Sequence, residues 1–178
     1  MDEVTTRVDQ QLIPVRLFGG GFAALRIFSG LIWLSNGLAK AFLNKNSSID
    51  LGFVSFNLIN QPTAKGILDG ASKDTFQPLH WIYQDFVLAN WSFFAWFLTV
   101  AEIAAGLSLL FGVAARLGAT IGLLLIGPIW IMLLHKNHYL WEYPNELFPL
   151  LLLAIVPAGR VFGQDRTLAA RFGGHWPF

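Results

Sequence analysis

Four ionisable residues interrupt stretches of the sequence that are otherwise apolar. Arg26 and Lys40 lie in the first stretch, Glu102 lies in the second, and Glu146 lies in the last. Inserting an ionisable side chain into a membrane-spanning helix costs about 2.5 to 3.5 kcal/mol or more, so such a residue ordinarily faces a polar site inside a bundle. These residues are therefore the first candidates for a binding site, or for an ion pair that fixes how the helices pack.

The depths of these residues in a membrane follow from the rise of a helix. Glu102 and Glu146 each precede an arginine at the inner end of a span by 14 residues, which places both acids about 21 Å outward of that end. Arg26 lies ten residues after Arg16, about 15 Å from the same boundary. These depths predict that Arg26 pairs with Glu102, with Glu146 or with both. Lys40 is expected near the outer boundary, where its long side chain reaches water.

Polar and aromatic residues are concentrated between 135 and 146. They are His135, Asn137, His138, Tyr139, Trp141, Tyr143, Asn145 and Glu146. A mostly apolar pocket with a few hydrogen-bonding groups suits a quinone headgroup, so the expected pocket combines this rim with Arg26, Lys40 and Glu102. Haem is not expected, because b-type haem in a bilayer is held by histidines deep in facing helices, and the four histidines of this chain lie elsewhere. No metal site is expected either.

The composition suits a bilayer better than water. Of the 178 residues, 54% are hydrophobic and 13% are charged, about half the charged fraction of an average soluble domain. The net charge of +1, without a clustered basic face, argues against nucleic acid as a partner. The sequence contains no cysteine, which excludes disulfides, thiolate nucleophiles, iron–sulfur clusters and zinc–thiolate sites.

Four stretches are candidates for membrane-spanning helices, each of which needs about 20 mostly apolar residues. They cover about 17–43, 91–115, 117–134 and 141–160, and the first is expected to be retained rather than cleaved as a signal peptide. Arginines near both ends, and in the turn between the second and third spans, predict that both termini are cytoplasmic. The expected fold is a single domain, 1–178: an all-α integral protein of the cytoplasmic membrane, built as a four-helix bundle.

The outer connection from 44 to 90 is too long to lack structure of its own. Asp74 and Thr75 followed by Pro78 are typical of a helix start. The residues after them fall on one apolar face, with two polar residues opposite: Leu79, Ile82, Tyr83 and Phe86, against Gln84 and Asp85. We therefore expect an amphipathic helix, which lies either in the outer membrane interface or as a connector on the mouth of the bundle.

Glycines share helix faces with the charged residues of the first two spans. Gly30 and Gly37 lie on the face of Arg26 and Lys40, and Gly106 lies one turn after Glu102. Small residues at these positions let a neighbouring membrane helix approach closely. Each charged face is therefore expected to meet another helix.

Three motifs in the chain resemble those of a known membrane family. They are the segment from Arg26 to Lys40, the segment from Glu102 to Arg116, and Ala158-Gly159-Arg160 followed by Gly163 and Asp165. Together they resemble the DoxX/DoxD-like membrane proteins, and the long outer connection resembles the DoxD type. The resemblance implies a four-helix membrane bundle associated with quinone-linked redox complexes, because DoxD-like proteins are the membrane subunit of thiosulfate:quinone oxidoreductase.

Two functions are open at the level of the sequence. The chain is either an accessory subunit that packs on larger chains of a quinone-linked redox or energy-transducing complex, or a quinone-interacting subunit of a thiosulfate:quinone oxidoreductase. The accessory role is favoured, because a chain without cysteine or a deep histidine pair has no evident means of holding a redox centre. The expected partners are the lipid bilayer, the larger subunits and a non-covalently bound quinone. Whether the chain is itself an enzyme stays open.

Overall fold

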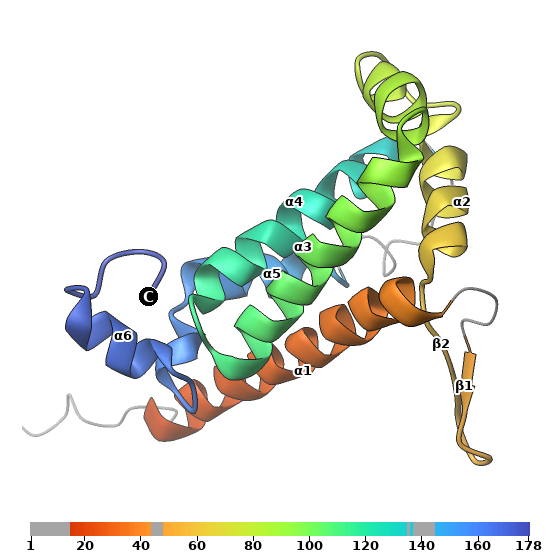
Figure 1. Cartoon of the computed structure of the whole chain (residues 1–178). Helices are drawn as coiled ribbons and strands as arrows, with labels where there is room; N and C mark the ends of the chain where they lie inside the picture. Colours follow the sequence, from red (N-terminus) through yellow and green to blue (C-terminus); the bar gives the residue numbers. More distant parts are fainter. Residues whose placement is uncertain (1–14, 44–47, 135, 137–144) are drawn as a thin grey trace, which may run out of the picture.

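The computed structural model describes residues 15–43, 48–134, 136 and 145–178. Most of them are helical, and four helices pack in the order α1, α3, α4 and α5, each beside the next (Figure 1). Their bounds are α1 Val15–Phe42, α3 Trp91–Phe111, α4 Ala115–Leu133 and α5 Leu147–Ile155. The outer connection contains β1 Ser48–Asp50, β2 Ser55–Asn57, α2 Gln61–Ser72 and a π-helix, η1, Trp81–Leu88. After α5 come the 3₁₀ turn η2, Ala158–Arg160, and the short helix α6, Asp165–Arg171.

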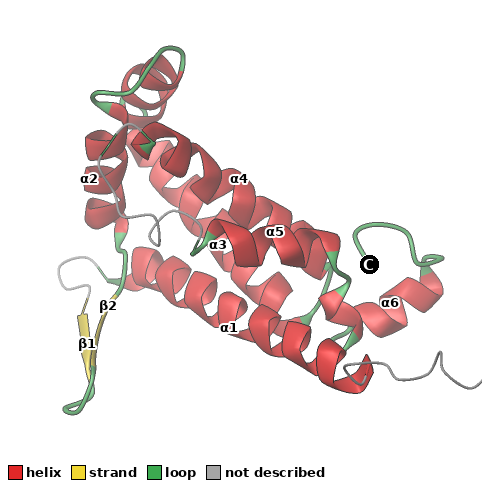
Figure 2. Cartoon of the chain, turned by 180° about the vertical axis from the view of Figure 1, so that it is seen from behind, coloured by secondary structure: helices red, strands yellow, loops and turns green. Residues whose placement is uncertain are grey.

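The two ends of the bundle differ in what they carry. The start of α1, the turn from α3 to α4, and α6 lie at one end, whereas α2, η1 and the two strands lie at the other, as both views show (Figures 1 and 2). The expected arrangement placed the outer connection opposite the turn between the second and third spans, and the fold has this arrangement.

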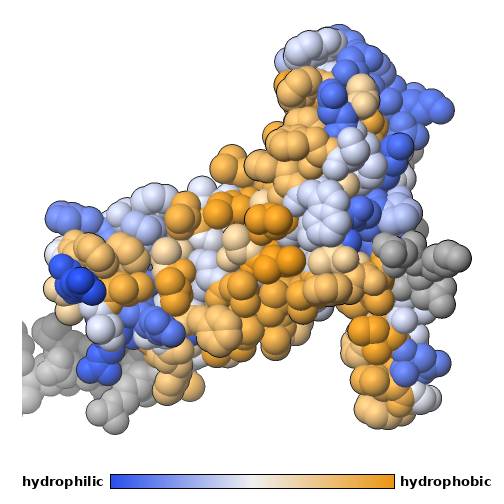
Figure 3. All heavy atoms as spheres, viewed as in Figure 1, coloured by the Kyte–Doolittle hydropathy of each residue, from blue (hydrophilic) through white to orange (hydrophobic). Residues whose placement is uncertain are grey.

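Three of the helices in the described part of the chain are long and apolar enough to cross a membrane. They are α1 over Leu17–Phe42, α3 and α4, and they correspond to the first three expected spans. Large apolar side chains are exposed along these helices, among them Leu31, Phe42, Phe93, Val100 and Ile131. Figure 3 shows the resulting broad hydrophobic surface on one side of the bundle. This surface is compatible with contact to lipid.

The expected fourth span is not confirmed. The last bundle helix, α5, has only nine residues, whereas the sequence predicted a span over 141–160, of which 141–144 lie outside the described residues. The helix ends where Val156 adopts an extended conformation before Pro157. A residue that precedes proline is disfavoured in the helical region, so Arg160 lies in a separate turn rather than at the end of a continuous helix.

Glycines bring α1 and α3 into close contact, as the sequence predicted. A Cβ placed on Gly30 would lie 2.5 Å from the backbone nitrogen of Leu110, and one on Gly106 would lie 2.5 Å from that of Leu34. A Cβ on Gly37 would lie 2.7 Å from the Ile103 side chain. Since these distances are shorter than atoms tolerate, only glycine permits this separation of the two helices.

The outer connection is only partly as expected. A helix follows Pro78, but over Trp81–Leu88 it is a π-helix, whose i→i+5 hydrogen bonds shift the side chains away from α-helical spacing. Val87 is therefore buried while Phe86 is exposed. Gln84, which the sequence placed opposite the apolar face, contacts α2, because its amide donates to Asp69 Oδ1 (3.0 Å) and Ser72 Oγ (2.9 Å).

The sequence analysis did not anticipate α2 or the two strands of this connection. Asn60 caps α2, since its side-chain oxygen accepts a hydrogen bond from the backbone N–H of Thr63 (3.0 Å). The antiparallel pair β1–β2 makes the fold less than purely α-helical. The packing of η1 on α2, and of both on the helix ends, agrees with a connector at the mouth of the bundle.

Candidate functional site

A buried ion pair joins α1 to α3. The ammonium Nζ of Lys40 lies 2.7 Å from Oε2 of Glu102, and the side chains are 4% and 14% exposed. Gly37, one turn before Lys40, and Gly106, one turn after Glu102, are two of the positions at which the helices are in close contact. The glycines and the ion pair therefore belong to one feature of the α1–α3 interface.

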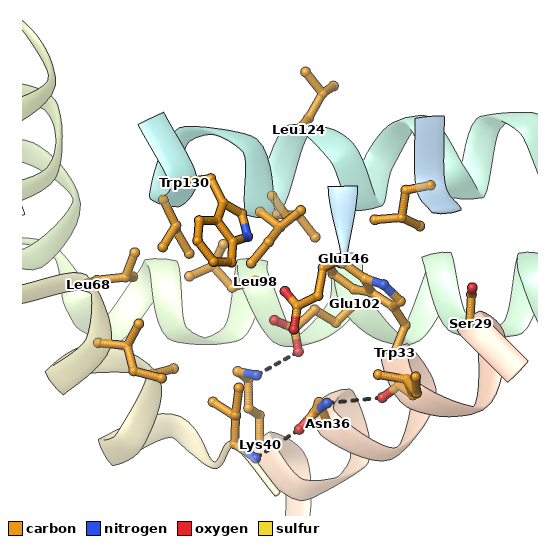
Figure 4. Close-up of a pocket in the computed structure, with 18 of the residues that line it drawn as sticks. Ser29, Trp33, Asn36, Lys40, Leu68, Leu98, Glu102, Leu124, Trp130 and Glu146 are labelled. Atoms are coloured by element: carbon orange, nitrogen blue, oxygen red, sulfur yellow. Dashed lines mark hydrogen bonds and ion pairs between the residues drawn. The ribbon is translucent and has the colours of Figure 1, made fainter. Parts of the chain in front are cut away.

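This ion pair lies in the wall of a cavity of about 540 Å³. The cavity is lined mainly by apolar side chains of α1, α3, α4 and α5, with a few polar and aromatic groups among them. Figure 4 shows the polar and aromatic members around the ion pair: Trp33, Asn36, Trp130 and Glu146. The remaining walls include Leu25, Phe28, Ile32, Phe94, Phe97, Leu98, Leu124, Ile126, Ile129 and Leu150.

The outer connection covers one end of this cavity. Leu68 of α2 and Tyr83 and Val87 of η1 contribute to its lining. Asn36 ties the cover to α1, because its Oδ1 accepts a hydrogen bond from the backbone N–H of Ile59 (2.8 Å), just before α2. Burial raises the pKa of the Tyr83 hydroxyl above its usual value, so this group is a neutral donor at neutral pH.

Arg26 does not meet Glu102, and this corrects the pairing that helix depths predicted. Its guanidinium is buried at the opposite end of the bundle and donates to the backbone oxygens of Leu109, Leu110 (3.1 Å) and Phe162 (3.1 Å). Carbonyls in the last turn of a helix have no partner within it, and they favour a cation. Arg26 therefore closes the C-terminal end of α3 and does not line the cavity.

The expectation that Lys40 reaches water is wrong for a related reason. The depth argument treated each helix separately and ignored the register between them. The contacts of Gly30 with Leu110 and of Gly37 with Ile103 show that a step along α1 matches an equal step back along α3. In this antiparallel register Lys40 faces Glu102.

Asp165 completes the cluster around Arg26 at the inner end. Its two carboxylate oxygens accept hydrogen bonds from the backbone N–H groups of Ala114 (2.6 Å) and Ala115 (2.9 Å), at the start of α4. A carboxylate at a helix N-terminus is stabilised by the unpaired N–H groups and by the helix dipole. Asp165 also acts electrostatically on Arg26. The terminal motif of the sequence therefore has a structural role.

Glycines make room for this inner cluster. Gly112 ends α3 in a left-handed conformation, with φ of +63°. A Cβ placed there would collide with the Arg26 guanidinium and with Gly163, and one on Gly159 would collide with the Asp165 carboxylate. The glycines of the second and third motifs are thus required by the packing of Arg26 and Asp165.

The structure brings together only part of the expected pocket. Lys40, Glu102, Asn145 and Glu146 line the cavity, while His135, His138 and Tyr139 lie outside the described residues. The sequence analysis did not assign Asn36, Tyr83 or Trp130 to a site. Asn36 lies one helical turn before Lys40. This spacing could have indicated that the two side chains share a face and line the same site.

The described residues contain no group of three or more His, Asp or Glu that could hold a metal ion. Of the histidines, His80 bonds through Nδ1 to the backbone oxygen of Ser72 (3.1 Å) in the outer connection. No family model, curated protein or solved structure matches the chain. Its function is therefore argued from the residues of the cavity.

Proposed function

We propose that the chain is a four-helix membrane subunit of a quinone-linked redox complex, and that its cavity holds a quinone-type molecule. The observation that carries this proposal is the Lys40–Glu102 ion pair, buried in the wall of a mostly apolar cavity of about 540 Å³. Cavities of about 300 to 1,000 Å³ that are mostly apolar and contain a few polar groups are typical of small-ligand sites.

The ion pair has hydrogen-bonding capacity left for a ligand. Among the residues that the structure describes, Lys40 donates one hydrogen bond, to Glu102, although its ammonium has three donors. The second carboxylate oxygen of Glu102 accepts none from the same residues. A ring carbonyl can accept from Lys40 and a ring hydroxyl can donate to Glu102, so the pair fits both forms of a quinone.

The remaining walls fit the rest of such a molecule. Trp33 and Trp130 offer flat apolar surfaces for the ring, and the aliphatic residues of α4 and α5 suit an isoprenoid tail. A bound quinone supplies reversible two-electron, two-proton chemistry. The residues of the chain bind and orient the ring and exclude water from it.

Quinone content tests this proposal directly. The purified chain is extracted with organic solvent, and the quinone per protein is measured by mass spectrometry. A short-tailed quinone is also titrated while tryptophan fluorescence is followed. Glu146→Gln removes a charge from the cavity lining, and Asp85→Asn, at an exposed position of η1, is its matched control.

We expect quinone to co-purify with the wild-type chain and to quench its fluorescence. Glu146→Gln is expected to lower the content several-fold without loss of helical signal, and Asp85→Asn is expected to leave it unchanged. A wild-type chain that contains no quinone and is not quenched by the added quinone would contradict the proposal.

The alternative is a purely accessory subunit that packs on larger chains. The exposed aromatic side chains of α3 and η1, among them Phe93, Trp96 and Trp81, favour this alternative. Trp81→Ala separates the two roles, because Trp81 is exposed and does not line the cavity. An accessory role predicts that this change releases the chain from larger subunits in mild detergent and that redox rates are insensitive to Glu146→Gln.

A further inference from the structure

The two strands of the outer connection form a hairpin with two different faces. Ile49 pairs with Phe56, while Ser48 pairs with Asn57 and Asp50 pairs with Ser55. Since successive side chains of a strand point to opposite faces, one face carries the apolar pair and the other carries only polar residues. Leu51 and Val54, one step further toward the turn, continue the apolar face by the same alternation.

The tip of the hairpin, residues 51–54, is a hydrogen-bonded turn made of apolar residues and glycine. The backbone N–H of Leu51 donates to the carbonyl of Val54 (2.9 Å), and that of Gly52 donates to Asp50 Oδ1 (2.8 Å). Gly52 has a φ of +83°, a left-handed conformation that suits glycine. Phe53 follows it and is 90% exposed, the largest exposure among the large apolar side chains described.

Within the described part of the chain, the hairpin stands out from the bundle and has almost no support from other elements. All six of its strand residues are exposed. It projects sideways from the outer end of α1, crosswise to that helix, in both views (Figures 1 and 2). An isolated two-stranded hairpin is at best marginally stable in water, so this one requires another surface against its apolar face.

The direction of the apolar face indicates what that surface is. In Figure 3 the side of the hairpin turned toward the bundle is hydrophobic, and the side turned away carries hydrophilic residues. The hydrophobic side therefore faces the same region as the exposed apolar surface of α1, which ends at Phe42, six residues before the hairpin. That region is occupied by lipid if α1 crosses a membrane.

We propose that the hairpin is an interfacial anchor that lies on the outer leaflet, with Phe53, Ile49 and Phe56 inserted among the lipids. Its polar face, which includes Asp50, then remains in water. No charged residue occurs from 51 to 64, so nothing in the turn or the second strand opposes insertion. Exposed phenylalanine and leucine beside a polar face are typical of segments that lie in the membrane interface.

Site-directed spin labelling tests the anchor, because the sequence contains no cysteine and one introduced cysteine is labelled uniquely. Phe53→Cys and Phe56→Cys place a nitroxide at the tip and on the apolar face, and Ser55→Cys is the matched control on the polar face. Each full-length variant is reconstituted at low protein density in phosphatidylcholine vesicles. Collisions of the nitroxide with oxygen, which concentrates in lipid, and with a water-soluble nickel complex are then compared.

We expect the ratio of oxygen to nickel collisions to be several-fold higher at 53 and 56 than at 55. Equal ratios at the three positions would overturn the anchor, because the hairpin would then lie in water. Protection of position 53 from both reagents would also overturn it, since the tip would then be covered by protein. The result is independent of whether the cavity binds a quinone.

Discussion

Removing one partner of the Lys40–Glu102 ion pair should leave a charge in a place from which water is largely excluded. Glu102→Gln leaves the ammonium of Lys40, which is 4% exposed, and Lys40→Met leaves the carboxylate of Glu102, which is 14% exposed. Breaking a buried pair in this way costs about 3 to 5 kcal/mol of unfolding free energy. The residue left without a partner can instead become neutral. The free energy of neutralising it therefore sets an upper limit on the loss of unfolding free energy.

This upper limit differs between Glu102→Gln and Lys40→Met. At pH 7, neutralising a lysine with a reference pKa of 10.4 costs about 4.6 kcal/mol, and neutralising a glutamate with a reference pKa of 4.3 costs about 3.7 kcal/mol. Glu102→Gln should therefore be the more damaging single change. At pH 5 the limit for an orphaned glutamate falls to about 1 kcal/mol, so the deficit of Lys40→Met, but not that of Glu102→Gln, should shrink on acidification.

A double-mutant cycle measures the interaction between the two residues. The free energy of unfolding is obtained by titrating the chain in mild detergent micelles with dodecyl sulfate while helical circular dichroism is followed. The double variant should cost less than the sum of the single changes by at least about 2 kcal/mol, because it leaves no orphaned charge. Additive costs would refute the ion pair.

Arg26 provides the matched control for the cycle. It lies 14 residues before Lys40 on α1, about 21 Å along the helix axis. Arg26→Gln should be destabilising, because Arg26 is fully buried among backbone carbonyls, but its cost should add to that of Glu102→Gln. Coupling between these two changes would restore the pairing that helix depths suggested.

Three further results are expected. Asp165→Asn should lower the unfolding free energy by about 2 kcal/mol, measured by the same titration, because a charged acceptor of two backbone hydrogen bonds at the start of α4 is lost. Gly106→Ala should reduce assembly or heat stability, whereas Gly66→Ala, at an exposed position of α2 where a Cβ would meet nothing within 4 Å, should be neutral or slightly stabilising. In intact cells an impermeant thiol reagent should label Lys73→Cys but not Thr167→Cys, both at exposed positions, and the opposite pattern would reverse the orientation.

The sequence predicted the apolar helices well because that signal is additive along the chain. Hydropathy over about 20 residues identifies a span without reference to any other part of the molecule. The first three spans match α1, α3 and α4 within a few residues. The same reasoning extended the fourth span to Arg160, but Pro157 ends α5 earlier, so a local backbone constraint overrode the hydropathy.

The outer connection was harder to predict because its signals are weak or non-local. The strands β1 and β2 have three residues each, too few for an alternating pattern to stand out. The helix α2 is rich in small and polar residues and has only Leu68 as a large buried side chain. On η1 the predicted apolar face is wrong at Phe86, which is exposed while Val87 is buried, because a π-helix changes the spacing on which the prediction rested.

The pairing of the buried charges was nevertheless encoded in the sequence, in the glycines rather than in the depths. A depth estimate positions each helix relative to the membrane, and each end of a predicted span is uncertain by about one helical turn. Glycines at a close contact instead fix one helix against the other, because a shift by one residue would drive a side chain into the opposing backbone.

Matching Gly37 of α1 with the turn before Gly106 of α3 in an antiparallel pair brings Lys40 to Glu102 and leaves Arg26 opposite Gly112. Gly112 is also where α3 ends, so Arg26 meets carbonyl oxygens that need a donor. The same register thus accounts both for an ion pair in the cavity and for a buried arginine whose hydrogen bonds go to backbone carbonyls.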